Sequence, residues 1–178
     1  DMAKMGMDFS AMEKTGKFFL VGGPIAQITS LMDKVDATDE HLLKEIEEII
    51  KKNKIKRVVI DSINLLLMLS ETEKGKRETM ASLCNTLSRL GCTSLILSER
   101  PEGELHLSKY GIEEFIVDGV IILYNQETAD KSTSSLGLCV RKMRGTAHTR
   151  AIKGYEITDA GIVVHSDDTF FADMNGLK

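Results

Sequence analysis

An aspartate and a serine-glutamate pair follow apolar segments of the chain, at positions where metal and phosphate chemistry is common. Asp61 comes directly after an aliphatic run, and Ser98 and Glu99 close a second one. A carboxylate at a strand end has the form of the acid that holds Mg²⁺ beside a nucleoside triphosphate. The alternative is that Asp61 caps the turn or helix that follows it. Asp61 is therefore a candidate metal ligand whose role depends on its surroundings.

Two cations near the carboxyl end form a second candidate group. Residue alternation over 136–144 places Lys142 and Arg144 on one side of a predicted strand that Gly145 ends. They follow three alternating aliphatic residues, Leu136, Leu138 and Val140. Paired cations can stabilise the charge on a transferring phosphoryl group, in their own subunit or in a neighbouring one. The alternative is a solvated basic strand end.

Helices and strands alternate in the part of the chain that carries Asp61. Apolar residues recur at helical spacing over 39–52 and about 76–90, and Gly91 is placed to end the second helix. The segments at 57–62 and 93–99 are uniformly aliphatic strands, as expected when helices cover a parallel sheet on both faces. A strand-helix-strand unit pairs its strands in parallel. We therefore expect Asp61, Ser98 and Glu99 to cluster at the carboxyl edge of the sheet, where ligands bind in open α/β sheets.

The remaining segments complete a predicted α/β fold, a mainly parallel sheet flanked by helices with antiparallel strands toward the carboxyl end. An apolar run at 17–22 predicts a buried strand, with a linker up to about residue 37. After a loop, four further strands are predicted at 119–125, 136–144, 151–157 and 161–165. We expect one domain over residues 1–165 and a loosely held tail over 166–178.

Composition restricts the class of protein. The chain has 178 residues, enough for one compact domain, and lacks both a long apolar stretch and the pattern of a secretory signal. We therefore expect a cytoplasmic protein without a membrane segment. The net charge of -4 does not indicate DNA binding, which would need a local basic patch.

Several motifs, in order, resemble the KaiC family of RecA-like P-loop ATPases. KMRGTAH at 142–148 and GYEITDAGIVV at 154–164 resemble the segment that closes such domains. The resemblance extends over about 40–165 through RVVIDSINLLL at 57–67, LILSERPEG at 95–103 and SKYGIEEFIVDGVIIL at 108–123. It implies a RecA-like fold, ATP and Mg²⁺ as cofactors, and a homo-oligomeric ring, a hexamer, with nucleotide at the subunit interfaces.

The resemblance also implies residue roles. Asp61 would be the Walker B acid, holding Mg²⁺ through water, and Lys142 and Arg144 would act in trans on the ATP of the neighbouring subunit. Ser98 and Glu99 resemble the sensor element, and the loop at 100–110 would face the pore of the ring. Further nucleotide contacts are implied for the backbone of Met143 and for Thr146, His148, Arg150 and Asp159.

Two features of the family do not occur in the sequence. It contains no GxxxxGK(S/T) phosphate loop, and the family's paired glutamates, which act on the attacking water, have no counterpart. Because residues 1–9 resemble the segment after those glutamates, we expect an incomplete domain that begins after the Walker A loop and is inactive alone, within an ATPase. The alternatives are a non-catalytic assembly or regulatory module and a RadA-like DNA-binding recombinase paralogue.

Overall fold

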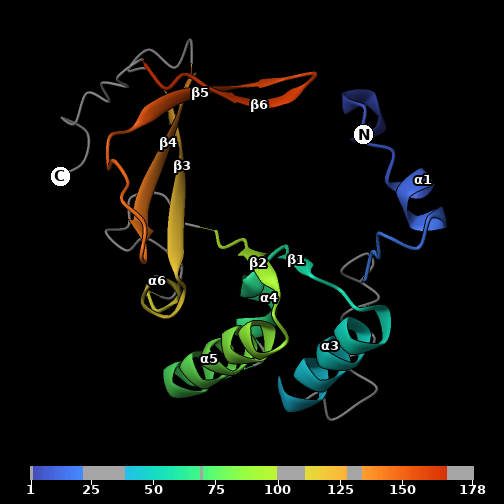
Figure 1. The fold of residues 1–178 in the computed structure, drawn as a ribbon. Helices are drawn as coiled ribbons and strands as arrows, with labels where there is room; N and C mark the ends of the chain where they lie inside the picture. Colours follow the sequence, from blue (N-terminus) through green and yellow to red (C-terminus); the bar gives the residue numbers. More distant parts are fainter. Residues whose placement is uncertain (1, 22–38, 69, 100–110, 128–133, 168–178) are drawn as a thin grey trace. The chain divides into compact units, whose positions relative to one another are not determined.

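The computed structural model describes residues 2–21, 39–68, 70–99, 111–127 and 134–167. The chain divides into two compact units, one of residues 1–22 with 118–178 and the other of residues 23–117. Each unit has its own secondary structure and is described by itself (Figure 1). Among the described residues, no helix is long and apolar enough to cross a membrane.

The unit of residues 23–117 is an α/β arrangement. Its elements are α3 (Asp39–Asn53), β1 (Arg57–Ile60), α4 (Ile63–Leu67), α5 (Glu73–Arg89), β2 (Thr93–Ile96) and α6 (Glu113–Ile116). The two strands pair in parallel, with Ile60 opposite Ile96, as the strand-helix-strand order predicts. The predicted α/β class and both predicted helices are confirmed, although each strand ends before the polar residues that were expected to close it.

Helix α5 begins three residues earlier than its apolar spacing predicts. Thr72 caps it, because the threonine hydroxyl oxygen accepts a hydrogen bond from the Gly75 N–H at 3.0 Å. At the other end Gly91 has φ +70°, the left-handed conformation that ends many helices. The predicted stop at Gly91 is therefore confirmed, while the start was set by a cap that apolar periodicity does not reveal.

An aliphatic core holds this unit together. It lies between the helices and one face of the strands, and its buried members are Ile50, Ile63, Leu66, Leu67, Met80, Leu83 and Leu87. Val58 and Ile60 of β1 pack against this core, whereas the alternate residue Val59 is 64% exposed. The expectation that helices cover both faces of this sheet is therefore wrong for the described residues, because the helices α3, α4 and α5 contribute to the core on one face only.

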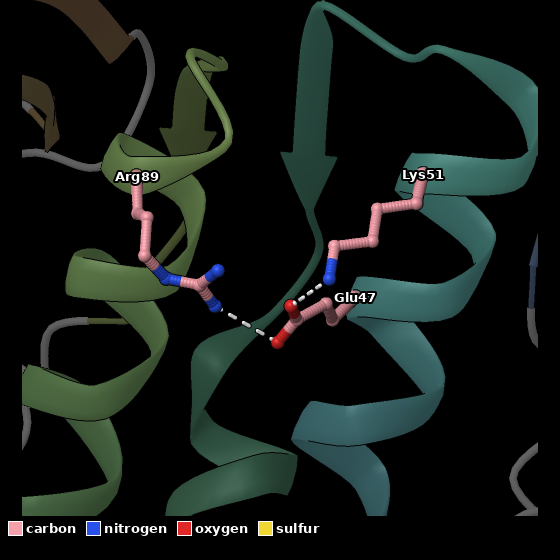
Figure 2. A network of polar contacts seen from close by, with 3 residues as sticks. All are labelled: Glu47, Lys51 and Arg89. Carbon is pink, nitrogen blue, oxygen red and sulfur yellow. Dashed lines mark hydrogen bonds and ion pairs between the residues drawn. The ribbon is translucent and has the colours of Figure 1, made fainter.

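A polar contact joins α3 to α5 outside the core (Figure 2). The Glu47 carboxylate pairs with Lys51 Nζ at 2.6 Å, one turn along the same helix, and with Arg89 Nη2 of α5 at 2.9 Å. These hydrogen bonds, first that to Lys51 and then that to Arg89, hold the pKa of Glu47 below its ordinary value of 4.5. The contact links the surface of α3 to the last turn of α5.

The other unit contains an antiparallel meander. Its strands β3 (Gly119–Glu127), β4 (Ser134–Met143), β5 (Lys153–Thr158) and β6 (Gly161–Val164) follow one another in a four-stranded sheet. Their order and antiparallel pairing agree with prediction. Ile122 and Cys139 face each other and are buried, whereas Ile121 and Leu123 of the same strand are exposed.

The amino-terminal segment departs from prediction. It forms a 3-10 helix, η1 (Met2–Met5), and a short α-helix, α1 (Phe9–Lys14), and the Phe9 ring stacks on Phe18 at 4.8 Å. Residues 17–21 are not a strand, and Leu20 and Val21 are exposed. The strand prediction at 17–22 is therefore wrong for these residues, because an apolar run becomes a strand only beside a pairing partner. The predicted linker and the last eleven residues of the tail lie outside the described residues.

Candidate functional site

Asp61 lies at the carboxyl edge of the parallel strand pair, immediately after β1. The backbone before and after Asp61 forms hydrogen bonds with Leu97, the residue that follows β2. Leu97 N–H donates to the Ile60 carbonyl at 2.9 Å, and Ile63 N–H donates to the Leu97 carbonyl at 3.0 Å. Asp61 itself is exposed. The backbone therefore presents the Asp61 carboxylate to solvent from a segment held at both ends.

Ser98 lies at the same edge and leads into a polar cluster. Its hydroxyl donates to Glu113 Oε1 of α6 at 3.0 Å, and Asn64 Oδ1 of α4 lies 3.5 Å from the same hydroxyl. Glu113 and Asn64 are both buried, whereas Glu99 is exposed. The structure thus brings Asp61 and Ser98 to one edge through Leu97, as expected, and adds two buried polar residues behind them.

Sequence reasoning did not single out Asn64 or Glu113. Asn64 is the one polar residue in the short helix INLLL, and Glu113 opens the short helix EEFI directly after the buried Ile112. A polar side chain isolated within an apolar run is the signal that could have identified Asn64, because such a group is buried only with a hydrogen-bonding partner. Glu113 carries no such signal, because Glu114 follows it.

The end of β4 carries the predicted cations. Lys142 pairs with Val120 and Val140 pairs with Ile121, so Arg141 is an extra residue, a β-bulge. Cross-strand partners share a face, and the bulge therefore places Lys142 on the opposite face from Val140. The expectation that Lys142 continues the side of Leu136, Leu138 and Val140 is wrong, because a one-residue bulge shifts the alternation.

Arg144 directly follows β4, and both its backbone and its side chain contact Asp118. Its N–H donates to the Asp118 carbonyl at 2.8 Å, and its guanidinium Nη1 pairs with Asp118 Oδ1 at 3.1 Å. The side chains are 52% and 89% exposed, so this ion pair lies in solvent. Met143, between the two cations, lies over Gly119, where a Cβ atom would be 2.9 Å from its sulfur.

The connection between β4 and β5 carries three more predicted residues, Thr146, His148 and Arg150, all exposed. It turns at Gly145, which has φ +67°. His148 Nδ1 lies 3.0 Å from the Thr146 carbonyl, and the Arg150 carbonyl accepts from Cys139 Sγ at 3.3 Å. These contacts give the connection a defined backbone and leave its polar side chains on the surface.

Asp159 occupies the turn between β5 and β6 and is exposed. Beside it, the Thr158 hydroxyl accepts from Ala160 N–H at 3.2 Å and donates to the Gly161 carbonyl at 3.0 Å. The tight turn holds Asp159 on the meander, the unit that also carries Lys142, Arg144 and the connection after β4.

The predicted site residues therefore form two sets. Asp61, Ser98 and Glu99 belong to the α/β unit, and the residues from Lys142 to Asp159 belong to the meander. The predicted pore loop at 100–110 lies outside the described residues. Within the described parts of the chain, no three His, Cys, Asp or Glu side chains gather into a metal-binding group.

Comparisons with known proteins identify the family. Residues 1–169 match the family model described as "ATPase: KaiC". A UPF0273 protein from Thermotoga maritima is 34% identical over 175 residues, which cover 94% of this chain and 70% of the relative. The circadian clock oscillator protein KaiC of Synechococcus elongatus is 28% identical over 158 residues, and the chain spans 30% of its length.

The fold has a solved counterpart. The crystal structure of a KaiC-like protein from the archaeon Pyrococcus horikoshii matches with a TM-score of 0.73 and 36% identity. The match covers 92% of this chain and 67% of that structure. The predicted RecA-like fold is confirmed by this likeness. The chain belongs to the KaiC family of ATPase domains.

Proposed function

We propose that this chain is part of a Mg-ATP hydrolysing domain that acts in a homo-oligomeric ring, a hexamer, with nucleotide at the subunit interfaces. In each interface Asp61 of one subunit faces the metal side of the ATP, and Lys142 and Arg144 of the neighbour face its phosphates. The observation that carries the proposal is the exposed cationic end of β4, within a segment that matches the family.

The ion pair of Arg144 suits a residue that exchanges partners. An ion pair between solvent-exposed side chains contributes only about 0–1 kcal/mol. A guanidinium bound to phosphate oxygens makes shorter, charge-assisted hydrogen bonds, often two at once. Breaking the exposed ion pair with Asp118 therefore costs little, and the Arg144 charge would then oppose the negative charge that grows during phosphoryl transfer.

The position of Asp61 suits a metal ligand held through water. The carboxylate is exposed at the edge where α/β sheets bind ligands, and its backbone is anchored to Leu97 on both sides. When bound with ATP, Mg²⁺ would neutralise charge on the phosphates. Asp61 would orient a water ligand of that ion. Thr146, His148, Arg150 and Asp159, together with the Met143 backbone, would contact the nucleotide, and Ser98 and Glu99 would sense its phosphate.

Action in trans can be tested by mixing two inactive variants of the protein that carries this chain. Asp61→Asn removes the metal-side carboxylate, and Arg144→Ala removes the guanidinium. In rings assembled from equal amounts of both variants, about a quarter of the interfaces combine an intact Asp61 with an intact Arg144. We therefore expect mixing to restore about a quarter of the ATP turnover of the unaltered protein.

A matched mixture controls for assembly effects. Lys142→Ala and Arg144→Ala both alter the subunit that supplies the cations to its neighbour's ATP. Every subunit in their mixture lacks one of the two cations and no interface has both intact on that side, so mixing these two variants should restore no turnover. Recovery in neither mixture would contradict action in trans. Absence of ATP turnover in the unaltered protein would overturn the whole proposal and favour a non-catalytic module.

A further inference from the structure

We propose that Glu113 is a positioning residue of the ATPase site, which holds Asp61 in place through Ser98 and Leu97. This inference rests on the function proposed above, because it assigns Glu113 a task only where Asp61 serves ATP hydrolysis. Glu113 touches neither the substrate nor the metal in this assignment.

The Glu113 carboxylate is buried and directed at the strand end. The residue is 5% exposed, and a buried carboxylate is stable only when hydrogen bonds replace its water. One oxygen accepts from the Ser98 hydroxyl at 3.0 Å, and the other accepts from the Ile112 N–H at 3.1 Å. The second bond is local to α6, whereas the first reaches fifteen residues back to the end of β2.

Ser98 is joined by one peptide bond to the residue that anchors Asp61. Leu97 bonds the backbone before Asp61, at Ile60, and the backbone after it, at Ile63. A displacement of Ser98 therefore moves Leu97, and both anchors of the Asp61 segment move with it. This path consists of covalent bonds and hydrogen bonds within one compact unit, and it ends at the proposed metal-side carboxylate.

Asn64 determines the direction in which the hydrogen bonds of the cluster run. Its Nδ2 atom is buried without a hydrogen-bond partner among the described residues, and its Oδ1 atom lies 3.5 Å from Ser98 Oγ. A half-turn of the amide would exchange its nitrogen and oxygen. Nδ2 would then donate to Ser98 Oγ while Ser98 donates to Glu113, a continuous chain from α4, the helix that follows Asp61, to α6. Glu113 is the acceptor at the end of this chain.

The test compares variants in the complete protein that carries this chain. Glu113→Ala removes the anchor. Glu113→Gln keeps one oxygen that can still accept from Ser98, but its amide nitrogen cannot accept from the Ile112 N–H. We expect Glu113→Ala to lower kcat about tenfold and to raise the Mg²⁺ concentration needed for half-maximal turnover about tenfold, with ATP binding in the absence of Mg²⁺ changed less than about twofold. Glu113→Gln should recover part of both losses, because it restores the bond from Ser98 but not that from the Ile112 N–H. Ser98→Ala should reproduce the effect of Glu113→Ala in milder form.

Thr79→Val is the matched control. It removes another partly buried hydrogen bond of the same unit, that between Ser70 and Thr79 at 3.2 Å, which is not part of the path to Asp61. Equal shifts of the Mg²⁺ requirement in Thr79→Val and Glu113→Ala would overturn the inference and leave Glu113 a structural residue. So would an unchanged requirement in folded Glu113→Ala and Ser98→Ala. Absence of ATP turnover in the unaltered protein would overturn the proposed function and this inference together.

Discussion

The two units bury their apolar side chains to different extents. In the α/β unit Ile63, Leu67, Met80 and Leu83 are 0% exposed, and the core is continuous across helices and strands. In the meander, Ile157 and Ile162 pair across β5 and β6 and are 65% and 57% exposed. The first unit is therefore stabilised by its own core. The second buries fewer side chains, among them Ile122, Cys139 and Tyr155, and depends more on backbone pairing. It presents Arg144, Thr146 and His148 at its surface.

The largest expected effect is that of a substitution in the meander, Arg144→Ala, which should reduce ATP turnover but leave stability almost unchanged. Arg144→Ala should lower kcat about a thousandfold. In other phosphoryl-transfer enzymes, an arginine that meets the developing charge raises kcat by a factor of roughly 10³–10⁵. The unfolding free energy should change by less than about 1 kcal/mol, since the ion pair with Asp118 is exposed. Steady-state ATPase assays and urea unfolding measure the two quantities.

Asp118→Asn is the control for this variant. It removes the same ion pair and keeps the guanidinium, so it should leave kcat within about threefold of the unaltered protein. A loss as large as that of Arg144→Ala would show that the ion pair with Asp118, and not the guanidinium alone, is needed for turnover.

Truncating one buried leucine tests the comparison directly. Leu83→Ala should reduce the unfolding free energy by about 2–5 kcal/mol, because it removes buried methyl groups and leaves a cavity in the core. Ile157→Ala on the exposed meander face should change it by less than about 0.5 kcal/mol. Both are measured by urea denaturation. A comparable loss in Ile157→Ala would mean that the assembled protein covers this face.

The sequence predicted element types better than details. Apolar periodicity identified both helices and the parallel pairing, because these features repeat over many residues. The run at 17–22 misled because its composition suits a strand whether or not a partner is present. The bulge at Arg141 could not be predicted, since it depends on the pairing of β4 with β3 rather than on either segment alone.

The candidate site was predicted in part. The parallel order of the strands predicted from topology alone that Asp61 and Ser98 share one edge. The roles expected of residues 142–159 came from the family motif and stay predictions. Asn64 and Glu113 were not identified because they meet Ser98 only in three dimensions, from segments 34 and 15 residues away. Long-range hydrogen bonds of this kind leave little trace in local spacing.

A smaller effect on stability is expected at the start of α5. Thr72→Ala removes the side-chain oxygen that accepts from the Gly75 N–H, and it should lower the unfolding free energy by about 1 kcal/mol. Thr72→Ser keeps the hydroxyl and should retain most of the stability. If both variants unfold at the same urea concentration, the cap contributes nothing and the helix start is set by core packing.

The smallest effect concerns Glu47 and depends on pH. Its pKa is held low in the folded chain by the hydrogen bonds to Lys51 and Arg89, so the folded state binds this proton less readily than the unfolded state. The contact therefore stabilises the fold above the ordinary pKa of 4.5, and this contribution is lost as pH falls through the lowered value. Glu47→Gln should be slightly less stable than the unaltered protein at pH 7, and the difference should shrink toward acidic pH and in 1 M salt, where the Debye length is about 3 Å. Urea midpoints measured for both proteins across that range test it, and a difference that grows toward acidic pH would show that Glu47 is not stabilised as the carboxylate.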